Sequence, residues 1–339
     1  MKRATVIIPT YNGGARIAAC LQALCAEAAG TDVELLVVDD GSTDNTVAVA
    51  GSFPQVRVLS QSNAGPAAAR NHGALQAQGD ILLFTDDDCV PLPGWLSTML
   101  APFDDLRVVG AKGAYRTRQR QLTARFVQIE YEDRYRIMAA LPAIDFVDTY
   151  SAAFRRKRFL EMGGYDTSFP VACAEDIELS YRMSARGWHM TFVPGAVVYH
   201  SHPAGLAQYL RKKFKFAYWR VFAVQKNPSK VAKDSHTPQL MKLQLALLPA
   251  IVVAAIAGAI TGRPLFALGA VGAAFLLTTL PFTFRAIPKD PLVGCLSPLF
   301  LAGRAVAQCL GVAGGVLFLL RRRDARPYAS TLPRGEQPY

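Results

Sequence analysis

The chain has 339 residues, of which 51% are hydrophobic, and its formal net charge is +11 at neutral pH. This length allows one large domain or two smaller ones. The six cysteines show no CxxC or Cys/His spacing, which excludes the common zinc motifs and is typical of a reducing compartment. The positive charge comes without a nucleic-acid recognition motif, so we expect no nucleic-acid partner.

Short apolar runs alternate with helical patterns in the N-terminal part, which is typical of βαβ units around a mostly parallel sheet. The first strands are expected at residues 4–9, 33–38, 56–60 and 81–85, with helices at 15–28 and 66–77 and a short helix capped by Thr43-Asp44-Asn45. Farther along, we expect strands at 108–115, 146–154 and 193–199 and helices at 122–138 and 175–185. The predicted fold class is α/β, with a Rossmann-like sheet and flanking helices.

Beyond residue 240 the chain is mostly Ala, Leu, Val, Gly and Phe. Two uncharged stretches, 243–261 and 265–284, are each close to the ~20 residues that a bilayer core requires, and we expect both to be transmembrane helices. A third apolar stretch, 292–320, contains Arg304, and a charge at the bilayer centre is costly. We expect it to re-enter or to lie along the interface. The alternatives are an interfacial piece followed by a span, two half-buried pieces, or a buried helical core formed by all three stretches.

A basic segment precedes these apolar stretches. In sequence only Asp234 opposes its cations, which are Arg211, Lys212, Lys213, Lys215, Arg220, Lys226, Lys230, Lys233 and Lys242. Such a segment favours anionic lipid headgroups and the cytoplasmic side of a membrane, and the alternative is a solvated helix face. The predicted division is an α/β domain at 1–202, a basic juxtamembrane segment at 203–240, a membrane domain at 241–322 and a polar tail at 323–339.

The charges that flank the two predicted spans indicate their orientation. Basic residues lie before the first span and after the second, so the positive-inside rule places both flanks in the cytoplasm. Arg321-Arg322-Arg323 favours the same side, which a single full span through 292–320 would forbid. No signal-peptide pattern follows Met1, and we therefore expect a multi-pass protein of the inner (cytoplasmic) membrane whose first domain lies in the cytoplasm.

Acidic residues gather where predicted strands end or a Gly-rich bend occurs. The three clusters are Asp39-Asp40, Asp86-Asp87-Asp88 and Glu175-Asp176. Open α/β sheets bind ligands at the carboxyl ends of their strands. Three adjacent carboxylates repel one another unless they share a cation, and Mg²⁺ and Mn²⁺ favour oxygen ligands. The pattern predicts a site for a divalent metal and a phosphorylated ligand, with one carboxylate left for proton transfer.

Five motifs in a fixed order carry a family resemblance. They are VIIPTYN at 6–12, VVDDGSTDNT at 37–46, NAGPAAARNHG at 63–73, GDILLFTDDDC at 79–89 and GGYD…AEDIELSYRMSARGW at 163–188. Together they resemble the family-2 glycosyltransferases with the GT-A fold. The resemblance implies a metal-dependent, inverting enzyme that moves a sugar from a nucleotide-sugar donor, with UDP-sugars favoured, to a hydroxyl acceptor. For a chain with membrane helices we expect a lipid-linked or cell-envelope glycan as acceptor and membrane lipids as partners.

The resemblance also assigns a nucleotide-sugar pocket. In it, Asp40 resembles the carboxylate that accepts a hydrogen bond from uracil, whereas Asp39 is the alternative because the two side chains leave an extended strand in opposite directions. For Asn63, capping of the following helix is an equally good interpretation. The expected pocket residues are Pro9, Thr10, Tyr11, Asp40, Asn63, Arg70, Asp86, Asp87 and Glu175.

The metal and the catalytic base follow from the same resemblance. Asp86 and Asp88 match the ends of the family's DxD motif, so we expect them to bind Mg²⁺ or Mn²⁺. A histidine completes the metal site in related enzymes. His200 and His202 are not separated by strand alternation, and we take His200 as the ligand. Asp176 is expected to deprotonate the acceptor, with a helix-capping role for the Glu175-Asp176 pair as the alternative.

Two other activities remain as alternatives. A processive polysaccharide synthase of this family would carry a QxxRW signature, and the segment that begins at Gln208 lacks its tryptophan, so transfer of one or a few sugars is favoured. A sugar nucleotidyltransferase would use similar metal chemistry. It would need a basic Gly-rich signature near the first strand, which is absent, and it leaves the helix that starts at Glu175 unexplained.

Overall fold

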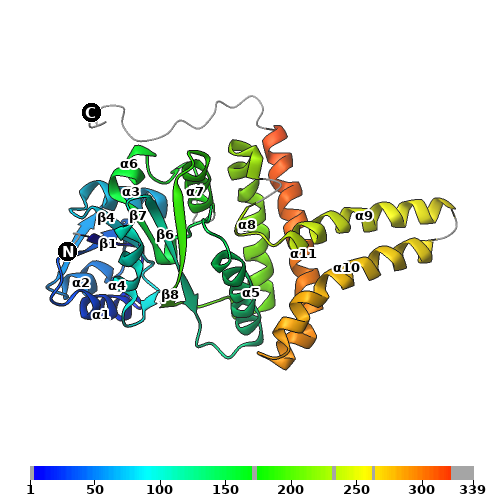
Figure 1. The fold of residues 1–339 in the computed structure, drawn as a ribbon, viewed down its shortest axis with the longest axis horizontal. Coiled ribbons are helices and arrows are strands. Elements are labelled where there is room, and N and C mark those ends of the chain that lie inside the picture. Colours follow the sequence, from blue (N-terminus) through cyan, green and yellow to red (C-terminus); the bar gives the residue numbers. More distant parts are fainter. Residues whose placement is uncertain (1–3, 170–173, 231–233, 262–263, 322–339) are drawn as a thin grey trace.

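The structure is a computed structural model that describes residues 4–169, 174–230, 234–261 and 264–321 (Figure 1). An α/β domain forms one end of the molecule, and long apolar helices extend from the other end (Figure 1). The predicted polar tail at 323–339, together with Lys233, Arg322 and Arg323, lies outside the described residues.

Four parallel strands form the first half of the sheet, as the alternating pattern predicts. They are β1 (Ala4–Thr10), β2 (Val33–Asp39), β3 (Val56–Ser60) and β4 (Ile81–Phe84), connected by α1 (Ile17–Ala28), α2 (Thr46–Gly51) and α3 (Pro66–Gln76). β1 pairs with both β2 and β4, and β3 pairs with β2. Val6 and Ile8 belong to the core that contains α1, whereas Ile7 belongs to the core with α3, so β1 is buried on both faces.

An antiparallel strand makes the second half of the sheet mixed. β7 lies between β4 and β6 and is antiparallel to both, within the strand order β3-β2-β1-β4-β7-β6-β8-β5. The strands here are β5 (Val90–Pro91), β6 (Val108–Arg116), β7 (Ala152–Arg155) and β8 (His189–Tyr199). The helices are α4 (Trp95–Leu100), α5 (Leu122–Ala139), α6 (Arg156–Glu161) and α7 (Glu175–Ala185), with 3₁₀ turns at Ala101–Asp104, Thr149–Ser151 and Pro228–Lys230. The predicted α/β fold class is confirmed, although the sheet is less parallel than expected.

The predicted strand at 146–154 is wrong over most of its length, because only Ala152–Arg155 joins the sheet. The reason lies at Asp148, whose carboxylate binds the ammonium of Lys112 inside the domain. Lys112 Nζ also donates a hydrogen bond to Tyr150 Oη, 2.8 Å away. This anchor holds the chain in a 3₁₀ turn before β7 and keeps Asp148 out of the strand ladder.

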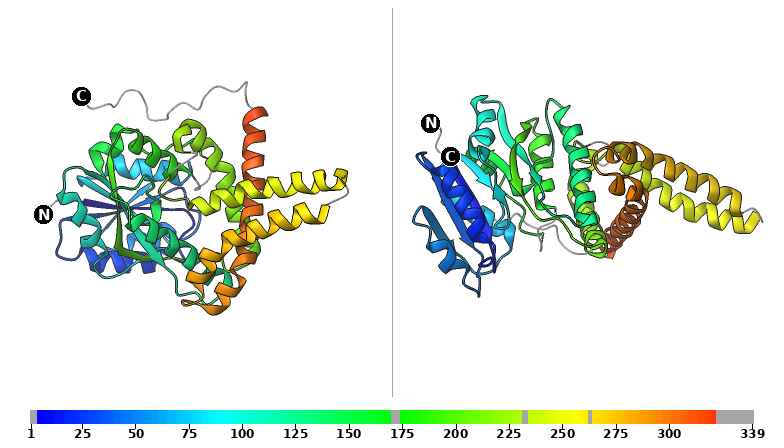
Figure 2. Two further views of the ribbon diagram at one scale, coloured as in Figure 1. Left: turned by 45° about the vertical axis from the view of Figure 1, so that its right-hand side comes forward. Right: turned by 90° about the horizontal axis from the view of Figure 1, so that it is seen from below.

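Three helices are long and apolar enough to cross a membrane. α9 (Gln239–Thr261) and α10 (Pro264–Ala286) form an antiparallel hairpin that projects from the α/β domain (Figures 1 and 2). α11 (Pro291–Arg321) instead runs transverse to this hairpin and alongside α8 (Leu206–Lys226). α11 is one continuous helix through Arg304, and the alternatives that divide this stretch into two pieces are therefore not observed.

Two features hold α11 against the α/β domain. Gly311 and Gly315 let it approach α8 closely, since a Cβ on Gly311 would lie 2.4 Å from the Phe214 carbonyl oxygen. Arg304 is 5% exposed, and its Nη1 donates to Glu130 Oε1 of α5 at 2.8 Å. The Arg304 side chain therefore faces protein rather than lipid, and the helix continues through it without a break.

The basic segment is largely α8 rather than a linker. Its charge is opposed by more than Asp234, because carboxylates distant in sequence pair with it. These pairs are Lys213 with Glu130, Lys226 with Asp166, Lys230 with Asp145, and both Arg220 and Lys242 with Asp234. Arg211 and Lys215 remain exposed on α8. The basic segment, expected to meet lipid headgroups or solvent, is thus partly an internal ion-pair network.

We expect the Glu130→Gln variant to unfold at a lower temperature than the wild type. The carboxylate is 3% exposed and faces cations from three helices, so its loss leaves buried positive charge without a partner, at a cost of about 3–5 kcal/mol. Thermal unfolding in detergent measures the effect. Glu132→Gln on the same helix is the matched control, because Glu132 pairs with Lys289 in a more exposed position. Equal melting temperatures for both variants would contradict the prediction.

Candidate active site

One cavity of about 760 Å³ opens at the carboxyl ends of the central strands. Its wall is formed by the ends of β1, β2, β4 and β8, the first turn of α7, and α8. Every site residue expected from the sequence lines it, namely Pro9, Thr10, Tyr11, Asp40, Asn63, Arg70, Asp86, Asp87, Asp88, Glu175, Asp176 and His200. Strand ends and one helix start thus gather residues that are far apart in the sequence.

Asp40 shapes one rim of the cavity. Its carboxylate accepts hydrogen bonds from Gln61 Nε2 (2.7 Å) and from the backbone N–H groups of Ala64 (2.9 Å) and Gly65 (2.8 Å). Gly65 has φ of 90°, a conformation that suits glycine, and it leads directly into α3. Asp39 instead accepts from the Ser42 backbone N–H and does not line the cavity. Of the two neighbouring carboxylates, Asp40, which was chosen as the pocket residue, lines the cavity, and the alternative Asp39 does not.

Asp87 is the most restrained carboxylate of its cluster. Thr10 Oγ1 donates to Asp87 Oδ2 at 2.6 Å, and Arg16 donates from Nε and Nη2 at 2.8 and 2.9 Å. These bonds fix the loop after β4 against the end of β1. Asp87 is 6% exposed, so it anchors the loop while its neighbours face the open cavity.

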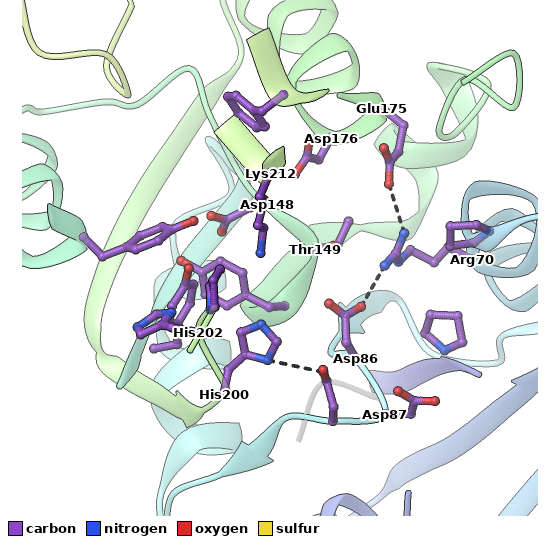
Figure 3. A pocket seen from close by; sticks show the side chains of 18 of the residues that line it. Arg70, Asp86, Asp87, Asp148, Thr149, Glu175, Asp176, His200, His202 and Lys212 are labelled. Atoms are coloured by element: carbon purple, nitrogen blue, oxygen red, sulfur yellow. Dashed lines mark hydrogen bonds and ion pairs between the residues drawn. The ribbon is translucent and has the colours of Figure 1, made fainter. Parts of the chain in front are cut away.

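Arg70 joins the two sides of the cavity (Figure 3). Its Nη2 donates to Asp86 Oδ1 at 2.7 Å, and its Nη1 donates to Glu175 Oε1 at 3.2 Å. Arg70 is 2% exposed, and its guanidinium connects the loop after β4 to the first turn of α7 by hydrogen bonds. Arg70 therefore sets the position of Asp86 relative to the Glu175-Asp176 pair.

A possible metal position lies at Asp88. His200 Nδ1 lies 3.3 Å from Asp88 Oδ1, and ligand atoms of Asp88, Cys89 and His200 all lie within 4.8 Å of one another. Within the described part of the chain, the buried His200 Nδ1 has no hydrogen-bond partner. An imidazole nitrogen that makes no hydrogen bond and lies this close to a carboxylate oxygen fits a divalent ion held between them. Burial raises the pKa of the Cys89 thiol, which makes it the poorer ligand of the three.

His202 serves a different purpose from His200. Its ring stacks on Tyr131 at a centroid distance of 5.7 Å, and its Nε2 lies 3.0 Å from Gln128 Oε1. Burial and the charge of His200 lower its pKa to about 3. A neutral, buried and hydrogen-bonded imidazole is a packing residue, so the geometry separates the two histidines.

Asp176 lies at the start of α7 and faces the same cavity (Figure 3). Its Oδ1 accepts from the Ile177 backbone N–H at 2.7 Å. Burial and the nearby charges of Glu175 and Asp148 raise the pKa of Asp176 well above its ordinary value. A carboxylate with a raised pKa is a stronger base than an exposed one, which suits proton abstraction near neutral pH.

Comparison with known proteins identifies the domain. Residues 5–163 match the family described as glycosyl transferase family 2. The α/β domain of this chain belongs to that family. An uncharacterized glycosyltransferase of Escherichia coli (strain K12), YibD, is 33% identical over 167 residues, which are 48% of this chain and 47% of the relative. A pre-mycofactocin glycosyltransferase of Mycobacterium tuberculosis is 27% identical over 240 residues, or 67% of this chain and 49% of the relative. The chain thus spans about half the length of these curated relatives.

A solved structure extends the likeness beyond the family match. The mannosyltransferase PcManGT from Pyrobaculum calidifontis superposes with a TM-score of 0.60 at 21% identity. The alignment covers 93% of this chain and 87% of the mannosyltransferase. The predicted GT-A fold of this family-2 glycosyltransferase domain is confirmed.

Sequence reasoning missed several polar residues that line the cavity of the transferase domain. Arg16, Arg134, Asp148, Lys212 and His236 all face it. Asp148 had the clearest signal, because its partner Lys112 lies within the apolar run Val108–Arg116 and a buried lysine must find a buried partner. The others sit on helices or loops whose distance from the strand ends is set only by tertiary packing.

Proposed function

We propose that this chain is a membrane-attached, inverting, metal-dependent glycosyltransferase that moves a sugar from a nucleoside diphosphate donor to the hydroxyl of a lipid-linked or envelope glycan. The observation that carries the proposal is that Asp176 and the Asp86–Asp88–His200 set face one cavity in a family-2 domain. UDP-sugars are the first donors to test. The mannosyltransferase of similar fold was solved with GDP-mannose and Mn²⁺, and donors with guanine belong in the same panel.

The residues present fit a divalent ion, because the orphaned His200 Nδ1 lies beside Asp88 and because carboxylate and imidazole are suitable ligands. Asp88 and His200 would hold the ion, and Asp86, whose Oδ1 binds Arg70, would offer its second oxygen. When bound, the ion would neutralise charge on the departing diphosphate.

Asp176 would act on the acceptor. It takes the proton of the attacking hydroxyl, the hydroxyl oxygen bonds to the anomeric carbon, and the bond from that carbon to the diphosphate oxygen breaks. Attack from the face opposite the leaving group inverts the anomeric configuration. Arg70 would hold the first turn of α7, which carries Glu175 and Asp176, at a fixed distance from Asp86. It would do so through its hydrogen bonds to Glu175 and Asp86.

Incubation with a panel of nucleotide sugars tests the function directly. Purified protein, Mn²⁺, membrane lipid extract and each radiolabelled donor are combined, and labelled lipid and released nucleoside diphosphate are measured. We expect one donor to label the lipid fraction with equimolar release of the nucleoside diphosphate. Elongation to a long polymer would instead support the processive synthase, and release of pyrophosphate from a sugar phosphate and a nucleoside triphosphate would support the nucleotidyltransferase.

Lys212 is proposed to bind the diphosphate of the donor. It reaches from α8 into the cavity and makes no hydrogen bond or ion pair with the described residues (Figure 3). Burial lowers the pKa of Lys212, and the charges of Asp88 and Asp86 oppose this effect because both carboxylates lie close enough to attract the ammonium. An ammonium there would offset the negative charge of a leaving diphosphate.

We therefore expect Lys212→Met to weaken binding of nucleoside diphosphate about tenfold, the worth of one charge-assisted hydrogen bond. Binding of the matching nucleoside monophosphate should not change, because it lacks the second phosphate. Calorimetry with both ligands measures the difference. Lys215→Met, on the exposed face of α8, is the control. An equal loss of affinity for both nucleotides would overturn the assignment.

We also propose that α9 and α10 cross the inner membrane while α11 lies along its cytoplasmic surface, with the transferase domain in the cytoplasm. The support is the transverse course of α11, its buried ion pair to α5, and a row of exposed apolar residues along it. That row is Leu292, Leu299, Val306, Leu310 and Leu317, each at least 47% exposed. One face of α11 thus packs on protein, and the other is apolar enough for lipid.

Cysteine labelling of intact cells tests this topology. In a cysteine-free background, Thr261→Cys at the exposed end of α9 should react with an impermeant reagent from outside. Arg321→Cys at the end of α11 should react only after the cells are opened, because the proposed topology leaves this residue in the cytoplasm. Efficient labelling of Arg321→Cys in intact cells would show that α11 crosses the membrane as a third full span.

A further inference from the structure

The cavity continues past Asp176 toward the apolar helices. This inner chamber is lined by Tyr209 and Phe216 of α8, His236 and Met241 at the start of α9, and Gln308 of α11. None of these positions belongs to the five motifs that carry the family resemblance. A cavity that runs from the metal position to helices with exposed apolar faces joins two chemically different environments.

Arg134 and Lys213, which line the chamber, belong to a buried cluster in which cations outnumber carboxylates. Glu130 is the shared partner of three cations, with Lys213 Nζ at 2.7 Å, Arg304 Nη1 at 2.8 Å and Arg134 Nη2 at 3.2 Å. Each of these four residues is at most 8% exposed. One carboxylate cannot balance three cations, and buried charge without compensation is costly.

A second buried carboxylate lies behind Arg220, another cation that lines the chamber. Asp234 is 8% exposed and lies 2.9 Å from Arg220 Nη2 and 3.2 Å from Lys242 Nζ, so two cations share one carboxylate. Burial and the charges of Arg134 and Arg304 lower the pKa of Lys213 to about 7 even though Glu130 raises it. An anion in the chamber would relieve the repulsion among these cations.

His236 supplies a hydrogen-bond donor. Its Nε2 lies 3.2 Å from Arg134 Nη1, and an arginine can only donate, so Nε2 accepts and Nδ1 carries the proton. His236 is 4% exposed, and its Nδ1 has no partner among the described residues. The ring packs on Phe146 at a centroid distance of 3.9 Å, which fixes its orientation. A fixed, unsatisfied donor beside excess cations fits an anionic oxygen.

We propose that the inner chamber binds the phosphate of a lipid-phosphate-linked sugar, with its lipid chain leaving past Met241 and Gln308 between α9 and α11. The inference rests on the proposed function and deepens it, because it names the acceptor class. The sugar of such an acceptor extends from the phosphate toward Asp176 and presents its hydroxyl to that base. The phosphate pairs with Arg134 and Arg220 and accepts the proton of His236 Nδ1 in a hydrogen bond.

Photoaffinity labelling tests the chamber without knowledge of the natural acceptor. The probe is a prenyl phosphate with a diazirine on its chain, and the matched probe is the corresponding prenyl alcohol. We expect the phosphate probe to label wild-type peptides that contain Met241 or Gln308. His236→Phe, which keeps the aromatic packing, and Arg220→Gln should each lower labelling about tenfold. Lys215→Gln on the exposed face of α8 should label like the wild type.

Competition and nucleotide binding separate the possible outcomes. Nucleoside diphosphate with Mn²⁺ should bind His236→Phe and Arg220→Gln as it binds the wild type, which shows that both variants are folded. Equal labelling by the alcohol and the phosphate, or unchanged labelling of both variants, would overturn the proposal. Loss of labelling when excess nucleoside diphosphate is added would assign the phosphate site to the donor. Failure of nucleoside diphosphate to bind the wild type would count against the proposed function, while the labelling pattern still reports on the chamber.

Discussion

Asp176→Asn is expected to abolish glycosyl transfer while binding of nucleoside diphosphate with Mn²⁺ stays nearly intact. The amide cannot accept the acceptor's proton, but it preserves the size of the side chain and its carbonyl oxygen can still accept from the Ile177 N–H. Loss of a general base lowers turnover about 10²–10⁴-fold. Turnover and calorimetry on the same preparation measure both quantities. Loss of binding that matches the loss of turnover would make Asp176 a structural cap of α7.

The pH profile of the wild type provides a control for this assignment. Asp176 acts as a base only when ionised, so activity should fall as the pH drops through its pKa. Burial and the Glu175 and Asp148 charges raise that pKa, and the acid limb should lie above 3.8, the value of an ordinary aspartate. In Asp176→Asn the residual activity should lose this limb. A residual activity with the same limb would assign the titration to another group.

Asp88→Ala is expected to remove activity and metal dependence together. Without this carboxylate, His200 alone would hold the ion against the diphosphate, and turnover should fall about 10²–10³-fold, as when a charge-stabilising group is lost. Activity is measured with Mn²⁺ and with excess chelator. The wild type should lose activity in chelator, whereas the variant should be equally inactive in both.

Asp105→Ala provides the matched control, since Asp105 pairs with Arg107 on the surface far from the strand ends. It should keep both the activity and the response to chelator. Wild-type activity that survives in excess chelator would overturn the metal proposal. Lys212, Arg70 and backbone amides would then have to carry the charge of the leaving group.

Local patterns were sufficient for the first half of the sheet. Each of its strands is an apolar run followed by a turn signal, and the helix predicted at 175–185 is observed as Glu175–Ala185. Parallel strands covered on both faces need such runs, so their position is encoded over a few residues. The carboxylates that follow these runs were placed in one cavity for the same reason, because parallel strand ends meet at one edge.

Choices between neighbouring residues required the tertiary structure. Strand alternation placed His200 and His202 on one side, yet only His200 lies beside Asp88, because Gln128 and Tyr131 of α5 hold His202. The partner of each side chain came from a helix whose position the strand pattern does not specify.

Ion pairs between residues far apart in the sequence could not be predicted from the sequence, again because they depend on how the helices pack. From the sequence, Arg304 was a charge that is costly inside a membrane span. The segment that forms α8 was a basic stretch opposed only by Asp234. In the fold, Glu130 lies 174 positions before Arg304 and still receives its Nη1 hydrogen bond. Hydropathy and spacing report how a segment meets solvent or lipid, so they determined that the apolar helices exist. The cost of a buried charge depends on its nearest opposite charge, and only the packing of α5, α8 and α11 decided where that charge lies.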